Sequence, residues 1–118
     1  MSERTYLDFL NDILYSLQKA QSFIEGMTFE EFSTDEKTHF AVVRALEIVG
    51  EAVKRLPPDL KNQYPTVPWR AMAGMRDKLV HDYFGVNLQV VWETVLNEAP
   101  VMESVMRSLL AEQHPHQE

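Results

Sequence analysis

The side chains of this chain that could do chemistry are concentrated in residues 74–85, which contain Arg76, Asp77, His81 and Tyr83. An imidazole titrates near neutral pH and can take or give a proton. A guanidinium can hold a phosphate through its fixed fork of donors. These groups are sufficient for cleavage of RNA without a metal ion. His81 would activate a 2′-hydroxyl, and Arg76 would stabilise the charge that develops on phosphorus.

The spacing of these residues on a helix decides which of them can act together. Arg76 and Tyr83 are nearly aligned, about 20° apart around the axis. Asp77 precedes His81 by one helical turn, so it can orient the His81 ring or bias its charge. Arg76 and His81, however, lie about 140° apart on a straight helix. Either the helix is distorted or a second copy completes the cleft in a two-fold dimer, and we favour the dimer.

A plainer interpretation treats the same stretch as a core helix. Leu79, Val80 and Phe84 would then face inward, and Arg76 and His81 would lie on the surface. A short motif is a weak hypothesis without its structural context, so the spacing alone favours this interpretation.

Composition predicts a single ordered domain over residues 1–118, with a flexible tail from about residue 112. The prolines and glycines lie between long segments, which is typical of a helical fold. The absence of cysteine excludes disulfides, a thiolate nucleophile and a cysteine-based zinc site. There is no apolar run long enough to span a membrane, and the first five residues do not resemble a signal peptide. We therefore expect a cytoplasmic protein with no membrane contact.

The formal net charge of −7 argues against broad, salt-driven coating of nucleic acid. It does not exclude a small local site, because basic side chains outnumber acidic ones within residues 67–86. Any RNA contact should be confined to a cleft and easily screened by salt.

Apolar periodicity and capping signals predict several helices. Thr28 with Glu31 forms a capping box, Asp35 or Thr34 can cap the second long helix, and Asn87 can cap a later one. Gly74 is expected to allow close approach of another backbone. The expected helical segments cover residues 5–25, 29–32 and 36–55, one turn after Pro57, a helix from Pro68 into the motif, residues 88–97, and a final helix that Pro100 starts or kinks.

The second long helix is apolar over much of its circumference, so it should be central in the bundle or buried between subunits. Glu47 and Glu51 lie one turn apart, and Arg44 can pair with Glu47. Two interpretations of the acids remain open: they border the motif cleft and orient Arg76 or His81, or they form a solvated face. Two carboxylates are too few for a metal site, and we expect no metal and no cofactor.

Taken together, these segments resemble the HepT-like branch of the HEPN helical domains over nearly the whole chain. The resemblance implies an all-α bundle of four to five helices that forms a two-fold homodimer, with the motif helices lining a shared cleft. The segments that carry it are Tyr6-Leu7-Asp8, Leu46-Glu47-Ile48-Val49-Gly50-Glu51-Ala52, Tyr64-Pro65, Val67-Pro68-Trp69-Arg70, residues 74–86 and Trp92.

The resemblance also implies an activity and a partner. Many members are metal-independent ribonucleases that act as toxins of type VII-like pairs, together with an MntA-type nucleotidyltransferase antitoxin. Their motif is an Arg, four residues, a His, one residue and a Tyr, which here are Arg76, His81 and Tyr83. The antitoxin is expected to add AMP to Tyr83. Family members often have Asn after the Arg, and Asp77 in its place would repel a phosphate more than an amide does.

Two functions of different classes follow. The first is an endoribonuclease toxin in which Arg76 and His81 are catalytic and Asp77, Glu47 and Glu51 support them. The alternative is a non-catalytic helical dimer that binds a nucleotide or the nucleotidyltransferase. The acidic net charge slightly favours the alternative, and the intact Arg, His and Tyr set favours the ribonuclease.

Overall fold

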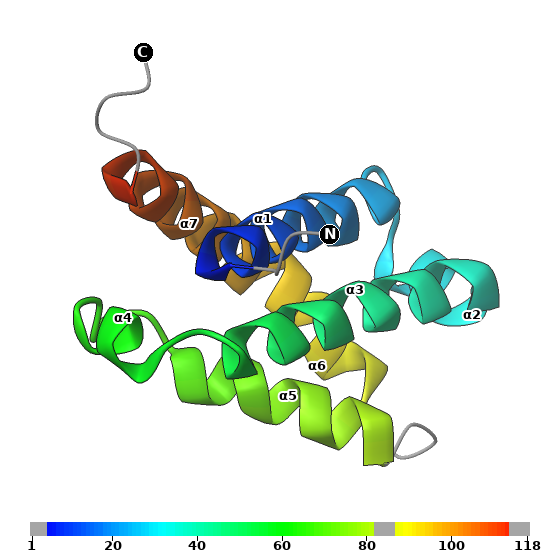
Figure 1. The fold of residues 1–118 in the computed structure, drawn as a ribbon. Helices are drawn as coiled ribbons and strands as arrows, with labels where there is room; N and C mark the ends of the chain where they lie inside the picture. The colour runs from blue at the N-terminus through cyan, green and yellow to red at the C-terminus, as the bar shows by residue number, and fades with distance from the viewer. Residues whose placement is uncertain (1–4, 82–86, 114–118) are drawn as a thin grey trace, which may run out of the picture.

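The computed structural model describes residues 5–81 and 87–113, without the side chains of Met75 and residues 78–81. Within these ranges the fold is all-α, with no strand, as predicted (Figure 1). The elements are α1 (Tyr6–Phe23), α2 (Phe29–Thr34), α3 (Glu36–Lys54), α4 (Pro58–Asn62), α5 (Trp69–His81), α6 (Leu88–Glu93), the π-helical turn η2 (Thr94–Glu98) and α7 (Ala99–Gln113).

The helix starts follow the capping signals of the sequence. Thr28 Oγ1 accepts from the Glu31 N–H at 3.2 Å, and Glu31 Oε1 accepts from the Thr28 N–H at 2.9 Å, which confirms the capping box. Asp35 Oδ1 accepts from the Thr38 N–H at 3.2 Å, and Asn87 Oδ1 accepts from the Gln89 N–H at 2.9 Å. Each side chain satisfies a backbone donor that the first helical turn leaves unpaired.

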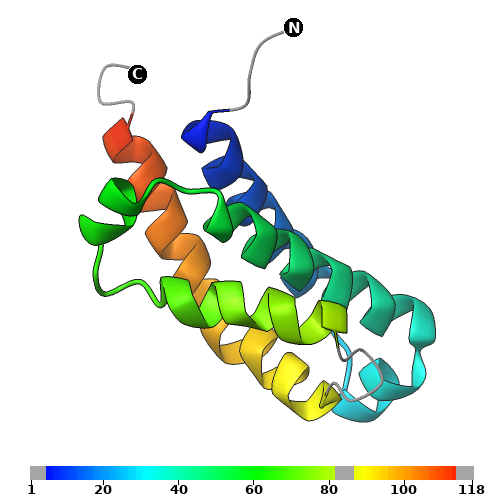
Figure 2. The same cartoon turned by 60° about the horizontal axis from the view of Figure 1, so that its bottom comes forward.

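Helix α3 is the centre of the bundle, which confirms the first of the two positions predicted for it. It packs against α1 on one side and α5 on the other, and α1 also packs against α7 (Figures 1 and 2). The buried residues of α3 are His39, Val42, Val43, Ala45, Leu46, Val49, Gly50, Ala52 and Val53. The motif helix α5 is therefore held against the most buried element of the fold.

The last helical run differs in detail from the pattern expected around Pro100. Helices α6 and α7 are joined by η2, so residues 88–113 are helical without an intervening loop. The Ala99 N–H donates to the Thr94 carbonyl, five residues back, as in a π-helical turn. A proline has no N–H and its ring crowds the preceding turn, so the widened turn lies directly before Pro100.

Helix α7 continues to Gln113 and is tied to other parts of the bundle. The Tyr64 hydroxyl donates to Glu112 Oε2 at 2.8 Å, and the Tyr6 hydroxyl donates to Gln113 Oε1 at 2.7 Å. Most of the tail expected from about residue 112 lies outside the described residues. None of the helices in the described ranges has the length and apolar character needed to cross a membrane.

Candidate functional site

The motif helix α5 is anchored at its beginning. The Trp69 indole N–H donates to the Lys61 carbonyl at 3.2 Å and the Tyr64 carbonyl at 3.1 Å, and Trp69 and Met72 are buried. From Trp69 through His81 the backbone is α-helical, without a break. No π-helical or 3₁₀ turn interrupts this segment, and on a regular α-helix Arg76 and His81 would be about 140° apart around the axis.

Arg76 lies where α5 crosses α3, and Gly50 makes that crossing possible. A Cβ placed on Gly50 would lie 2.0 Å from the Arg76 Cβ and 3.0 Å from the Met72 carbonyl oxygen. Only a glycine leaves room for so close an approach. The sequence had pointed to Gly74 instead, but a Cβ there would meet no described atom within 4 Å, and Gly50 provides the close contact within this chain.

Within the described part of the chain, the Arg76 guanidinium has one ion-pair partner, Asp77. Its Nη1 lies 3.4 Å from Asp77 Oδ1, and its side chain is 29% exposed. The Nε atom is buried and has no hydrogen-bond acceptor among the described residues. An arginine with one long contact to a neighbouring acid keeps most of its donors available to a ligand or to a partner chain.

Asp77 is held more closely by Lys54, at the end of α3, than by Arg76. The Lys54 Nζ donates to Asp77 Oδ1, the same oxygen that contacts Arg76. The hydrogen bond from Lys54 is the main cause that lowers the pKa of Asp77, with further contributions from the Lys54 charge and from Arg76. Asp77 is therefore an ionised carboxylate at neutral pH.

Lys54 was not singled out from the sequence. Lys54 follows Gly50 by one helical turn, so both lie on the side of α3 that faces α5. This spacing becomes informative only once the structure shows that Gly50 faces α5. The predicted action of Asp77 on the His81 ring stays a prediction, because the His81 side chain is not among those that the structure describes.

Glu47 and Glu51 are both paired with Arg44 on their own helix. Arg44 Nη1 lies 3.5 Å from Glu47 Oε1, which confirms the predicted pair, and 3.1 Å from Glu51 Oε2. These contacts lie along α3 and do not test whether the acids orient Arg76 or His81, so that role stays a prediction. Tyr83, the predicted modification site, lies outside the described residues.

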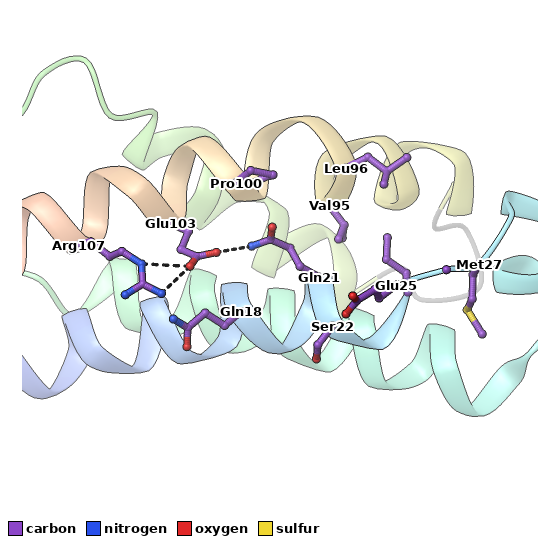
Figure 3. A pocket seen from close by; sticks show the side chains of 12 residues that line it. Gln18, Gln21, Ser22, Glu25, Met27, Val95, Leu96, Pro100, Glu103 and Arg107 are labelled. Carbon is purple, nitrogen blue, oxygen red and sulfur yellow. Dashed lines mark hydrogen bonds and ion pairs between the residues drawn. The ribbon is translucent and has the colours of Figure 1, made fainter.

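A hollow of the described surface that lies away from the motif has polar groups that are already paired with one another. Its volume is about 580 Å³, and it lies between the end of α1 and the η2–α7 run, with no lining residue from α5 (Figure 3). In it, Glu103 accepts from Gln21 Nε2 at 2.8 Å and from Arg107 Nη2 at 2.8 Å, so these polar groups satisfy one another. Among the described residues there is also no group of three or more His, Cys, Asp or Glu that could hold a metal ion.

Comparisons with known proteins identify the family. The family model described as ribonuclease HepT-like matches residues 13–109, a range that contains the whole motif. The chain belongs to this family.

Curated relatives agree with the family match. "Putative RNase MJ0127" of Methanocaldococcus jannaschii is 49% identical over 100 residues, covering 85% of this chain and 83% of that protein. "Probable ribonuclease HepT" of Thermococcus cleftensis is 46% identical over 107 residues, covering 91% of this chain and 97% of that protein. "Putative RNase TTE0752" of Caldanaerobacter subterraneus is 43% identical over 107 residues, covering 91% of this chain and 96% of that protein. No solved structure matches the chain.

Proposed function

We propose that this protein is a metal-independent endoribonuclease and the toxin of a toxin–antitoxin pair. The observation that carries the proposal is the match of the ribonuclease HepT-like model across Arg76, His81 and Tyr83. The names of the relatives support the same activity. The position of Arg76 also fits a phosphate anchor, since it is fixed by packing at Gly50 and remains partly exposed.

In the proposed reaction, His81 removes the proton from a ribose 2′-hydroxyl, and the resulting oxygen attacks the adjacent phosphorus. The bond to the 5′-oxygen breaks, and that oxygen takes a proton as it leaves. The products are a 2′,3′-cyclic phosphate and a 5′-hydroxyl. Arg76 stabilises the negative charge on the phosphoryl oxygens in the transition state.

The proposed active site is shared between two copies of the chain. The α-helical span Trp69–His81 supports this proposal, because on a regular helix Arg76 and His81 are about 140° apart around the axis and would not meet one phosphate from one face. A two-fold axis beside α5 would bring the Arg of one copy to the His of the other.

The proposed regulation is covalent modification of Tyr83 by an MntA-type nucleotidyltransferase antitoxin. The phenolic oxygen attacks the α-phosphorus of ATP, the tyrosine proton is released, and pyrophosphate leaves. Residues seven apart would be nearly aligned on a helix that continued to residue 83, so the new phosphodiester would occupy Arg76 and block the cleft.

A non-catalytic dimer that binds a nucleotide or the nucleotidyltransferase is the second candidate. The contact of Asp77 with Arg76 favours it, because an ionised acid beside the anchor opposes a substrate phosphate. Cleavage assays separate the two candidates directly.

The test is cleavage of a labelled single-stranded RNA by the purified protein, with and without EDTA. The wild type should cut with or without the chelator, and a DNA strand of the same sequence should resist. His81→Ala and Arg76→Ala should each reduce the rate by at least about a hundredfold. Arg70→Ala removes an exposed cation from the same helix and serves as the matched control. Cutting that persists in both variants, or is lost with EDTA, would place the chemistry elsewhere.

A further inference from the structure

The contact between Lys54 on α3 and Asp77 on α5 has no place in the proposed chemistry so far. Lys54 Nζ and Arg76 Nη1 both contact the same oxygen, Oδ1 of Asp77. We infer that Lys54 is a positioning residue of the proposed RNA site: its ammonium holds the Asp77 carboxylate and thereby leaves the Arg76 guanidinium available for a phosphate. This inference rests on the proposed function and extends it to a residue outside the motif.

The need for such a residue follows from the position of Asp77. A carboxylate and a phosphate compete for the same donors of a guanidinium. Asp77 is the next residue after Arg76, so folding cannot remove its charge from the neighbourhood of the anchor. Without another partner, the carboxylate would be the nearest anion for Arg76, and a substrate phosphate would have to displace it.

The observed geometry favours Lys54 over Arg76 as the principal partner of Asp77. The Arg76 contact is a single one of 3.4 Å, longer than a typical charge-assisted hydrogen bond. Lys54 Nζ donates to the same oxygen, and this hydrogen bond is the first cause of the lowered pKa of Asp77. Arg76 is therefore not clamped by its neighbour.

The three charged side chains are exposed enough for the network to act on ligand binding. The exposed fractions are 42% for Lys54, 47% for Asp77 and 29% for Arg76. Ion pairs with such exposure contribute little to the free energy of folding, because water and salt screen them. Their effect on an incoming phosphate can be larger, since the anion arrives at the same surface and exchanges contacts with it.

The crossing of α3 and α5 fixes this arrangement. Gly50 contacts Arg76, and Lys54 lies one turn further along α3, level with Asp77. The placement of Lys54 therefore depends on the same helix contact that positions Arg76.

The inference is tested by a double-mutant cycle on RNA binding. Lys54→Met, Asp77→Asn and the double variant are made in a His81→Ala background, and the Kd for a fluorescein-labelled single-stranded RNA is measured by anisotropy. Lys54→Met alone should raise Kd by about fivefold, the upper range for an exposed pair. With Asp77→Asn present, the same substitution should change Kd by less than about twofold. Lys54→Arg should restore binding.

Kinetics and a matched control complete the test. In the cleaving protein, Lys54→Met should raise KM and leave kcat nearly unchanged. Lys37→Met removes an exposed lysine from the beginning of α3 and should alter neither constant. Unfolding curves of each variant show whether a change in Kd reflects a change in the fold.

Equal losses in the presence and absence of Asp77→Asn would overturn the inference, because Lys54 would then attract RNA directly. An unchanged Kd in Lys54→Met would also overturn the inference, and the Lys54–Asp77 contact would then only connect α3 with α5. Both results leave the ribonuclease proposal standing. A wild type that neither binds nor cuts RNA overturns the proposed function and this inference together.

Discussion

At the scale of single residues, the chemistry of Arg76 is set by its neighbours. Gly50 provides the surface on which it packs, and Asp77 provides a negative charge that Lys54 holds in turn. The residue types of the motif were evident in the sequence, since Arg76, Asp77 and His81 lie within one short segment. The partner of Asp77 was not, because Lys54 is remote in the chain and only the crossing of α3 and α5 brings the two together.

Tyr83→Phe separates cleavage from its proposed regulation. The phenol is not the proposed acid or base, so the variant should keep most of its RNA cutting. It lacks the oxygen that accepts AMP, so it should escape silencing by the nucleotidyltransferase. Incubation of both proteins with the partner, ATP and magnesium, followed by intact mass and a cleavage assay, checks this. A Tyr83→Phe protein that still gains AMP and is silenced would place the switch on another residue.

Glu103→Gln tests an electrostatic contribution away from the motif. The hydrogen bond from Arg107 chiefly lowers the pKa of Glu103, and Gln21 and Gln18 lower it further. Because the pKa of Glu103 is lowered in the folded state, its ionised carboxylate stabilises the fold at pH values above its ordinary pKa of 4.5. This stabilisation is lost as the pH falls through the pKa of the folded state. The substitution should lower the free energy of unfolding by about 1 kcal/mol at pH 7.

Urea unfolding at several pH values measures this effect. The difference between wild type and Glu103→Gln should shrink once the pH drops below 4.5 and vanish in stronger acid. A difference that stays constant from neutral to acid pH would mean that Glu103 acts through packing alone.

At the scale of helices, the sequence predicted local features well and contacts between helices poorly. The caps of α2, α3 and α6 were predictable because Thr28, Asp35 and Asn87 act on backbone only a few residues away. The glycine that allows close helix packing could not be predicted, because Gly50 and Gly74 both lie within helices and only the crossing of α3 with α5 distinguishes them. The π-helical turn before Pro100 likewise has no separate signal in the apolar pattern.

The pair Gly50→Ala and Gly74→Ala tests this crossing. A methyl group at position 50 would overlap the Arg76 Cβ, so α5 must shift. The free energy of unfolding should fall by about 1 to 3 kcal/mol, and RNA cutting should fall with it. At position 74 a methyl group meets no described atom, and alanine favours the helix by about 0.5 to 1 kcal/mol.

Thermal unfolding and cleavage rates of both variants check these expectations. A Gly50→Ala protein with wild-type stability and activity would contradict the importance of the close contact. Loss of self-association in Gly74→Ala, with the stability of the chain retained, would place Gly74 between two copies, where the sequence had suggested a close approach.

At the scale of the whole molecule, the proposed active site requires two chains. On a regular α-helix, Arg76 and His81 would be about 140° apart around the axis, too far for one chain to bring both to one phosphate. Light scattering at micromolar concentration should therefore give the mass of a dimer. A monomer would remove the composite cleft and most of the mechanism with it.

Mixing two inactive variants tests the composite site more directly. When Arg76→Ala and His81→Ala subunits exchange, one copy supplies His81 and the other supplies Arg76, so some activity should return, about a quarter of the wild-type value if each dimer has two independent sites. Refolding the variants together and apart before the assay provides the comparison. Activity that stays absent in mixed dimers would show that both residues act from one chain.

The hydrogen bond between Tyr6 and Gln113 has a practical consequence for protein engineering. It joins the beginning of α1 to the end of α7, and both lie at the opposite end of the bundle from the end of α5 (Figures 1 and 2). Neighbouring ends of this kind allow a domain to be inserted into a host polypeptide or to be circularly permuted. A host polypeptide joined at these two ends would therefore enter and leave the domain away from the end of α5.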